Sequence, residues 1–275
     1  MNILIAGGSG FLGRELGKQA QAAGHTVTAT FATRAGDVGG IRWLPMDLRR
    51  SSEIAPVLRE SRPDVVINAA YRKADWAATA DGAIHLAMAA AGYGARLVHV
   101  SSDAVFSGSD VHYDESALPD PVTPYGAAKA AAETAIRLLA PAAVIARTSL
   151  IIGDGGSVHE TLVHELATGR RKGMLFTDDI RCPVHVADLA QAVLELAASD
   201  RAGTCHLAGS DALSRHELGV LIAERDALDA SRLASGRRAG TGSPGALDVR
   251  LDSTRTQRTL RTTLRGARDF LRRER

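Results

Sequence analysis

The feature that most constrains this chain is a set of spaced glycines directly after its first apolar segment. Residues 2–6 are apolar and partly β-branched, which is typical of a buried strand. Gly7, Gly10 and Gly13 follow with G-x-x-G-x-x-G spacing, and a helix is predicted over 11–23. At a strand–helix junction, glycines let a pyrophosphate approach the backbone at the helix N-terminus. We therefore expect this loop to bind a dinucleotide through Gly7, Ser9, Gly10, Phe11, Leu12, Gly13 and Arg14.

Strands and helices are predicted to alternate along the chain. Apolar runs indicate further strands at 25–31, 41–44, 64–68, 96–101 and 142–148. Helices are predicted at 51–61, 77–91, 124–139, 158–168, 186–199 and 215–224. This alternation predicts an α/β fold, a doubly wound, Rossmann-like parallel sheet covered by helices on both faces. We expect a dinucleotide-binding domain over 1–150 plus about 184–199, because the alternation loosens after Ile152. The segments of about 151–183 and 200–275 are expected to form a small C-terminal substrate lobe.

The composition narrows the possible functions. The chain has 275 residues, 45% of them apolar and 4% aromatic, with a formal net charge of +2, which argues against a nucleic-acid partner. No run approaches the ~18 apolar residues of a membrane span, and a signal peptide has no room before the first strand. Cys182 and Cys205 have neither metal-site nor disulfide-scaffold spacing, so a cytoplasmic location is expected. His159 and His164 lie about 140° apart on a predicted helix, so no metal site is expected.

The end of the second predicted strand bears on the choice of cofactor. NAD-binding folds usually place Asp or Glu there to bind the ribose hydroxyls, whereas this chain has Phe31. Thr33 and Arg34 follow, and Arg14 comes directly after the last glycine of the loop. Arginines without the acid suit a 2′-phosphate, so NADP(H) is expected rather than NAD. The alternative is that Arg34 is an ordinary loop charge.

Further cofactor-binding residues are expected where other strands end. The carboxyl ends of parallel strands meet at one edge of the sheet, where nucleotides bind. Asp47 and Leu48 follow the third strand and are expected beside the adenine. The remaining expected cofactor-binding residues are Ala69, Ala70, Tyr71, Ser101, Tyr125, Lys129 and Thr148.

A candidate reaction centre combines the end of the fifth strand with the start of the next helix. Ser102 ends the strand, and Tyr125 and Lys129 are four residues apart on the predicted helix. Residues at this spacing share one helix face, so both side chains can reach one pocket. We expect the Lys129 ammonium to lower the pKa of the Tyr125 phenol, which favours proton transfer near neutral pH. The Ser102 hydroxyl can bind a substrate oxygen.

The chain resembles the extended short-chain dehydrogenase/reductase superfamily, and within it the dTDP-4-dehydrorhamnose reductases, which are a sugar nucleotide-binding family. Residues 7–13, 62–71, 98–108, 124–129, 147–149 and 183–190 carry the resemblance. It implies NADPH-dependent reduction of a keto group on a nucleotide-linked sugar. Tyr125 would donate the proton, Lys129 would hold the nicotinamide ribose and tune Tyr125, and Ser102 would orient the carbonyl. The candidates for substrate binding are Asp103, Arg72, His185 and Arg250.

The chain also departs from this family. Between Tyr71 and Gly94 it is shorter by about a helix length, in a region that the family uses for dimer contacts, so a monomer and a homodimer both stay open. Ala104 replaces an aromatic residue, and the family's Arg-Pro motif before the segment 245–252 is absent. Two alternatives therefore stand beside the sugar reductase. One is a non-catalytic NADP-binding regulatory subunit, like the β subunit of methionine adenosyltransferase, and the other is a reductase of a non-sugar carbonyl in secondary metabolism.

The C-terminal part of the chain is basic. From Arg201 onward it has 15 arginines against 9 acidic residues, a net charge of +6, whereas the preceding part carries −4. A basic lobe suits an anionic ligand. We expect Arg237, Arg238 or Arg250 to bind a substrate diphosphate, and the alternative is that all three are solvated loop charges.

Overall fold

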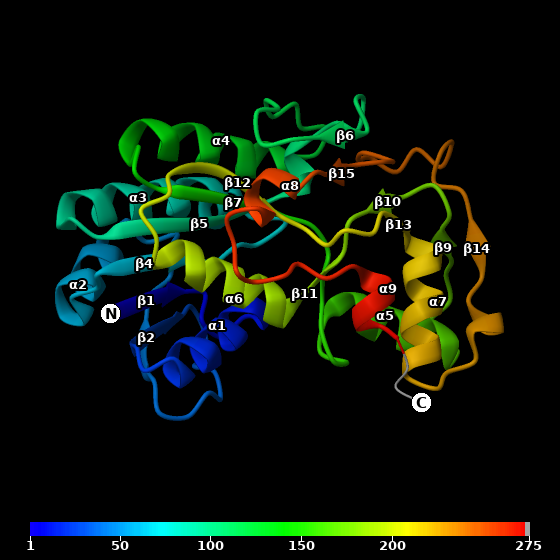
Figure 1. The fold of residues 1–275 in the computed structure, drawn as a ribbon, viewed down its shortest axis with the longest axis horizontal. Helices are drawn as coiled ribbons and strands as arrows, with labels where there is room; N and C mark the ends of the chain where they lie inside the picture. Colours follow the sequence, from blue (N-terminus) through cyan, green and yellow to red (C-terminus); the bar gives the residue numbers. More distant parts are fainter. Residues whose placement is uncertain (273–275) are drawn as a thin grey trace.

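Seven parallel strands form one sheet, in the order β3–β2–β1–β4–β5–β7–β12 (Figure 1). The computed structural model describes residues 1–272. The strands are β1 (Asn2–Ala6), β2 (Thr26–Phe31), β3 (Arg42–Pro45), β4 (Val65–Asn68), β5 (Arg96–Ser102), β7 (Val144–Thr148) and β12 (Gly203–Leu207). Ala6 pairs with Asn68, and Ser102 pairs with Thr148. This register brings the motifs at the strand ends to one edge of the sheet.

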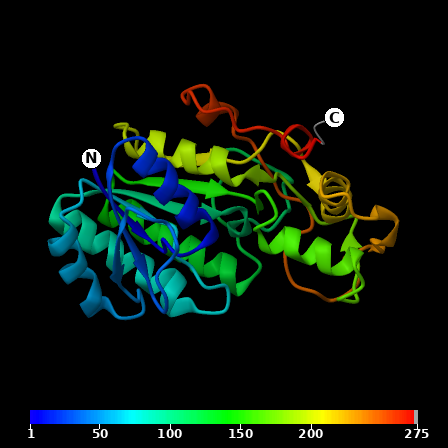
Figure 2. The same cartoon turned by 90° about the horizontal axis from the view of Figure 1, so that it is seen from below.

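Helices cover both faces of the sheet, as Figure 2 shows. One face carries α1 (Phe11–Ala22) and α6 (Val186–Ala197), and the other carries α2 (Ser51–Ser61), α3 (Gly82–Tyr93) and α4 (Pro124–Leu139). Strand residues alternate between the two cores. Ile3 and Ile5 pack with α1 and α6, whereas Leu4 and Ala6 pack on the other side. The strands are therefore apolar on both faces, which explains their continuous hydrophobic runs.

A smaller lobe lies beyond the carboxyl ends of the strands (Figure 1). Its core packs α5 (Val158–Ala167) against α7 (Arg215–Arg225). Each helix begins with a capping box, Ser157 with Glu160 in α5 and Ser214 with Glu217 in α7. In each box the serine hydroxyl and the glutamate carboxylate accept hydrogen bonds from backbone N–H groups, which fixes the start of the helix.

Short elements complete the structure. They are η1 (Ala77–Asp81), η2 (Asp103–Val105), β6 (His112–Tyr113), β8 (Ile151–Ile152), β9 (Leu175–Phe176), β10 (Ile180–Arg181), β11 (Val184–His185), β13 (Leu213–Ser214), η3 (Ala230–Arg232), β14 (Ser235–Gly236), β15 (Arg250–Leu251), α8 (Thr254–Gln257) and α9 (Ala267–Phe270). Among residues 1–272, none of the helices combines the length and the apolar character that crossing a membrane requires.

The predicted α/β fold with a doubly wound parallel sheet is confirmed. The sequence pattern does not predict β12, which lies in the segment expected for the substrate lobe. Its sequence, Gly-Thr-Cys-His-Leu, has no apolar run, and pairing with β7 makes it the seventh strand. Gly203–Leu207 thus joins the seven-stranded sheet, although it lies in the segment expected for the substrate lobe. The helix predicted at 77–91 begins with the π turn η1 before α3 continues it.

Candidate active site

The glycine loop lies where the strand order of the sheet reverses, between β1 and β4. Ligands of open α/β sheets bind at such points. Gly7 has a φ of +78°, and a Cβ there would lie 2.7 Å from the Cα of Ala70. A Cβ on Gly13 would lie 2.2 Å from the carbonyl oxygen of Gly7. Gly10 lines both hollows described below, and its missing side chain leaves the backbone there open to a ligand.

Two adjoining hollows extend from this loop. The first, which we call the crevice, has a volume of about 200 Å³ and lies past the ends of β2, β3 and β4. The predicted cofactor residues that line it are Gly7, Ser9, Gly10, Thr33, Asp47, Leu48, Ala69, Ala70 and Tyr71. Phe31 and Arg72 line it as well. Arg72, a substrate candidate from the sequence, therefore lies on the side expected for the cofactor.

The two arginines expected at the 2′-phosphate stand beside these hollows rather than in their walls. Arg34 is exposed and follows Thr33, which lines the first hollow. Arg14 is half-buried in the first turn of α1. Arg49 donates hydrogen bonds from Nε to both carboxylate oxygens of Asp47 at 3.0 Å, and this contact lowers the pKa of Asp47 to about 2. The guanidinium of Arg49 thus compensates the negative charge that Asp47 brings to the wall of the first hollow.

The second hollow, which we call the cleft, has a volume of about 290 Å³ and lies between the sheet edge and the lobe. Ser102, Tyr125 and Lys129 all line it. The other predicted residues in its wall are Gly10, Phe11, Leu12, Gly13, Ala69, Tyr71, Ser101, Asp103 and Thr148. The structure therefore brings the expected reaction centre and part of the glycine loop into one space.

The start of α4 positions Tyr125. The Thr123 hydroxyl caps the helix by accepting a hydrogen bond from the Gly126 backbone N–H at 3.1 Å. Gly126 also lets the helix approach the end of β5, because a Cβ there would lie 2.0 Å from the carbonyl oxygen of Ala104. The first turn of α4 is therefore held against the strand that ends in Ser102.

Lys129 lies deep in the cleft and is only 3% exposed. Its ammonium donates a hydrogen bond to the carbonyl oxygen of Val100 at 2.9 Å. Burial lowers the pKa of Lys129 to about 8, and the nearby Glu133 carboxylate opposes this shift. Lys129 therefore carries a positive charge at neutral pH.

The phenol of Tyr125 does not have the lowered pKa that the sequence predicts. Burial raises its pKa above the usual value, Tyr71 raises it further, and the contact with the Ser102 hydroxyl opposes the change. The Lys129 ammonium donates to Val100 rather than to the phenol, which explains the absence of the expected lowering. Tyr125 consequently keeps its proton at neutral pH and can act as an acid.

A hydrogen-bond network holds the substrate side of the cleft. Ser102 Oγ donates to one carboxylate oxygen of Asp103 at 3.2 Å and accepts from the Ala104 N–H at 3.2 Å. The Ser149 hydroxyl donates to the other Asp103 oxygen at 2.6 Å, and Arg181 Nε lies 3.6 Å from that oxygen. The orientation of Ser102 is therefore set by neighbours in η2 and just after β7.

Two substrate candidates from the sequence line neither of these two hollows. His185 accepts a hydrogen bond from the Ala187 N–H at 3.3 Å, caps α6, and packs 5.2 Å from the Phe270 ring centre. These contacts are structural. Arg250 lines a separate hollow on the β6–β15 side and pairs with Asp248 at 2.8 Å.

The other two arginines expected at a diphosphate are also held elsewhere. Arg238 donates to the carbonyl oxygen of Gly245 at 2.8 Å and pairs with Asp179 at 3.4 Å. The Arg237 side chain is 77% exposed and lies 3.5 Å from Asp178. Neither residue lines the cleft.

Four basic side chains line the cleft that the sequence does not mark as substrate-binding. They are Lys73, His159, Arg181 and Arg215. Arg215 belongs to the basic segment that begins at Arg201, and the capping box around it, Ser214 with Glu217, indicates a helix start rather than a ligand site. The net charge of the segment was the only available signal.

The two thiols are free and buried. Burial raises the pKa of Cys182 to about 11, so this thiol is not activated as a nucleophile. Within residues 1–272, no three His, Cys, Asp or Glu side chains are grouped so that they could hold a metal ion.

The strand order, the glycine loop and a serine–tyrosine–lysine cleft occur together in the extended short-chain dehydrogenases/reductases, and this chain has that architecture. More specifically, it belongs to the RmlD substrate binding domain family, whose family model matches residues 1–272. The family resemblance seen in the sequence is confirmed by this match.

Individual relatives span most of the chain. It is 30% identical over 243 residues to the spore coat polysaccharide biosynthesis protein SpsK of Bacillus subtilis, covering 84% of this chain and 82% of the relative. It is 31% identical over 248 residues to the dTDP-4-dehydrorhamnose reductase of Mycobacterium tuberculosis, covering 84% and 77%. The methionine adenosyltransferase 2 subunit beta of Mus musculus is 28% identical, covering 84% and 74%. The solved structure of a hypothetical dTDP-4-dehydrorhamnose reductase from Sulfolobus tokodaii has a TM-score of 0.83 at 27% identity, over 97% of each chain.

Proposed function

We propose that this protein is an NADPH-dependent reductase of a keto group, and that its substrate is a nucleotide-linked sugar. One observation carries the proposal: Ser102, Tyr125 and Lys129 line a single cleft that adjoins the glycine-loop crevice. The relative named dTDP-4-dehydrorhamnose reductase supports both the reaction and the substrate class.

The three side chains have complementary roles in this proposal. Tyr125, whose pKa is raised by burial, holds its proton and donates it to the ketone oxygen. Ser102 turns its hydroxyl to the same oxygen and orients the carbonyl. Lys129 holds the nicotinamide ribose through its ammonium group. The bound NADPH supplies the hydride.

The crevice fits a dinucleotide with a 2′-phosphate. Gly10 leaves the loop backbone open at the N-terminus of α1, where a pyrophosphate is favoured. Phe31 brings no carboxylate to the ribose, and the Asp47 charge is already compensated by Arg49. The side chains of Arg14 and Arg34 have no hydrogen-bond or ion-pair partner among residues 1–272, so they are the candidates for the 2′-phosphate. NADP(H) is therefore favoured over NAD(H).

A second candidate function is a non-catalytic NADP-binding regulatory subunit. The relative named methionine adenosyltransferase 2 subunit beta favours it. Such a role needs the cofactor crevice but no proton donor. A reductase of a non-sugar carbonyl is the remaining alternative. In each case we place the protein in the cytoplasm, because both cysteines are free thiols. A monomer and a homodimer are both compatible with this proposal.

Turnover of defined substrates tests the proposal. The purified protein is mixed with NADPH and with dTDP-, UDP- or GDP-linked 4-ketosugars, and with neutral ketones as a separate panel. We expect NADPH oxidation with at least one ketosugar nucleotide. Tight NADP binding, with no NADPH oxidation in the presence of any ketone, would contradict the reductase and support the regulatory subunit. Oxidation by neutral ketones alone would support the non-sugar alternative.

A further inference from the structure

The lobe side of the cleft holds a group of polar side chains apart from the proposed catalytic set. Arg215 is the first residue of α7, and His159 lies in the first turn of α5. Both line the cleft, and Nη1 of Arg215 lies 3.4 Å from Nδ1 of His159. The N-terminal turns of the two lobe helices therefore meet at the cleft wall.

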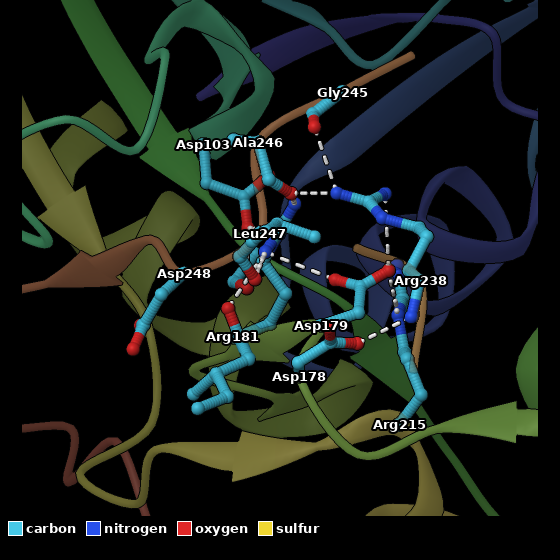
Figure 3. A network of polar contacts seen from close by, with 12 residues as sticks. Asp103, Asp178, Asp179, Arg181, Arg215, Arg238, Gly245, Ala246, Leu247 and Asp248 are labelled. Carbon is cyan, nitrogen blue, oxygen red and sulfur yellow. Dashed lines mark hydrogen bonds and ion pairs between the residues drawn. The ribbon is translucent and has the colours of Figure 1, made fainter. Parts of the chain in front are cut away.

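The ion pairs around Arg215 leave a surplus of positive charge. Figure 3 shows Asp179 between three arginines. An oxygen of Asp179 lies 3.0 Å from Arg181 Nη1, and the other lies 3.4 Å from Arg215 Nε and from Arg238 Nη1. Arg181 also contacts Asp103 at 3.6 Å. Three guanidiniums thus share two carboxylates, and one positive charge is left without a counterion in a poorly solvated network.

Arg215 is the arginine with donors to spare. Arg181 donates to the carbonyl oxygens of Ile180, Ala246 and Leu247, and Arg238 donates to those of Gly245 and Ala246. Within residues 1–272, the Arg215 side chain contacts only Asp179 and His159. Its Nη2 group has no hydrogen-bond or ion-pair partner among these residues, and Arg215 lines the cleft.

His159 is neutral, and its tautomer follows from its neighbour. Burial, together with the charges of Arg215 and Lys73, lowers the pKa of His159 to about 3. Because a guanidinium can only donate, Nδ1 of His159 accepts from Arg215 and Nε2 carries the proton. No residue among 1–272 accepts a hydrogen bond from this Nε2–H, so it is a second available donor.

We propose that Arg215 and His159 form a site for phosphate oxygens, and that they hold the diphosphate of the substrate while its sugar reaches Ser102 and Tyr125. Arg215, His159 and Lys73 line the same cleft and offer only donors, which favours an anion over a neutral group. This inference rests on the proposed function and specifies where the substrate carries its charge. It assigns the diphosphate contact to Arg215 instead of Arg237, Arg238 or Arg250.

Calorimetric titration of the NADP-loaded, full-length protein with dTDP, UDP and GDP tests the site. Arg215→Met removes the guanidinium, and Asp179 keeps Arg181 and Arg238 as partners. We expect this variant to bind the preferred nucleoside diphosphate at least about tenfold more weakly, because this is the scale of a hydrogen bond to a charged group. Its NADP affinity should be unchanged. The matched control is Arg237→Met, which removes the same charge from an exposed position of the lobe and should bind normally.

Three further variants keep the test decisive if Arg215→Met folds poorly. Arg215→Lys retains the charge but loses donors, so its affinity should lie between those of the wild type and Arg215→Met. His159→Leu removes the Nε2–H donor and should weaken binding, whereas His159→Gln retains an N–H donor and should restore part of it. Unfolding temperature and NADP affinity show whether each variant is folded.

The outcomes separate this site from the proposed reductase. Weaker nucleotide binding in Arg215→Met but not in Arg237→Met supports the site, even if the wild type reduces no ketosugar. Equal binding by both variants, or no binding of any nucleoside diphosphate by the wild type, overturns the site. Ketosugar reduction that is unaffected in Arg215→Met also overturns it and leaves the reductase standing.

Discussion

The rings of Tyr71 and Tyr125 lie 5.7 Å apart and are tilted by 50°, where the segment after β4 meets the start of α4. Tyr71 lines both hollows, and the Lys129 ammonium lies 5.6 Å from its ring centre. Tyr71 thereby connects the cofactor crevice with the reaction centre and helps to keep the Tyr125 phenol protonated. The roles of the Tyr125 phenol as proton donor and of the Lys129 ammonium can be tested separately.

Tyr125→Phe should lower turnover by about 10²–10⁴-fold, the usual contribution of a general acid. NADPH affinity should be nearly unchanged, because the ring and the glycine loop still shape the site. Steady-state rates and a fluorescence titration of NADPH measure the two effects. Tyr93→Phe, on an exposed tyrosine at the end of α3, is the control and should behave as wild type. Wild-type turnover in Tyr125→Phe would remove Tyr125 from the mechanism and favour the regulatory subunit.

The pH profile of turnover should reflect Lys129. Its pKa is lowered to about 8, and the cation is the form required, so turnover should be level below this pH and fall above it. Lys129→Met should lower turnover and remove the alkaline fall. The titration of Lys129 also affects folding stability, which rises with pH where turnover falls. Between about pH 8 and 10.5 the unfolded chain binds a proton that the folded protein does not, so this group favours folding more as pH rises through that window. If turnover of Lys129→Met still falls at alkaline pH, that fall belongs to another titrating group.

Arg34→Ala should weaken NADP binding by ~1.5–3 kcal/mol, the range for a hydrogen bond to a charged group. NAD binding should be unaffected because NAD lacks the 2′-phosphate. Isothermal titration with both dinucleotides measures the difference. Arg59→Ala, at an exposed position in the last turn of α2, is a control for the loss of one positive charge. Tighter binding of NAD than of NADP by the wild type would refute the predicted preference.

Glu133→Gln should destabilise the protein by about 3–5 kcal/mol, because it leaves a buried guanidinium without its counterion. Glu133 lies 2.8 Å from Arg147, the two side chains are 0% and 1% exposed, and Glu133 also accepts a hydrogen bond from Ser101 at 2.5 Å. Denaturant unfolding measures the free-energy change. Glu165→Gln, in a half-exposed ion pair on α5, should change stability by less than about 1 kcal/mol. The same Glu133→Gln change should move the alkaline fall in turnover to lower pH, because Glu133 raises the pKa of Lys129. Equal stability losses in Glu133→Gln and Glu165→Gln would contradict the stabilising role of the buried Glu133–Arg147 pair.

Local sequence patterns were sufficient to predict most of the sheet and several helices. Apolar runs mark six of the seven strands of the sheet, and the bounds predicted for α2 and α4 agree with the structure. The spacing of Tyr125 and Lys129 is sufficient to place both in one pocket, since residues four apart share a helix face. Gly10 could be assigned to the crevice because a loop between a strand and a helix has few possible conformations.

Features that depend on contacts between distant segments could not be predicted from these patterns. β12 has no apolar run and is a strand because β7 offers it a partner. The pKa of Tyr125 is raised, against the sequence-based expectation, because burial outweighs a neighbouring ammonium that donates to Val100 instead. His159 and Arg215 are 56 residues apart and meet because α5 and α7 pack together. Residue spacing encodes local geometry, whereas burial and long-range contacts exist only once the chain has packed.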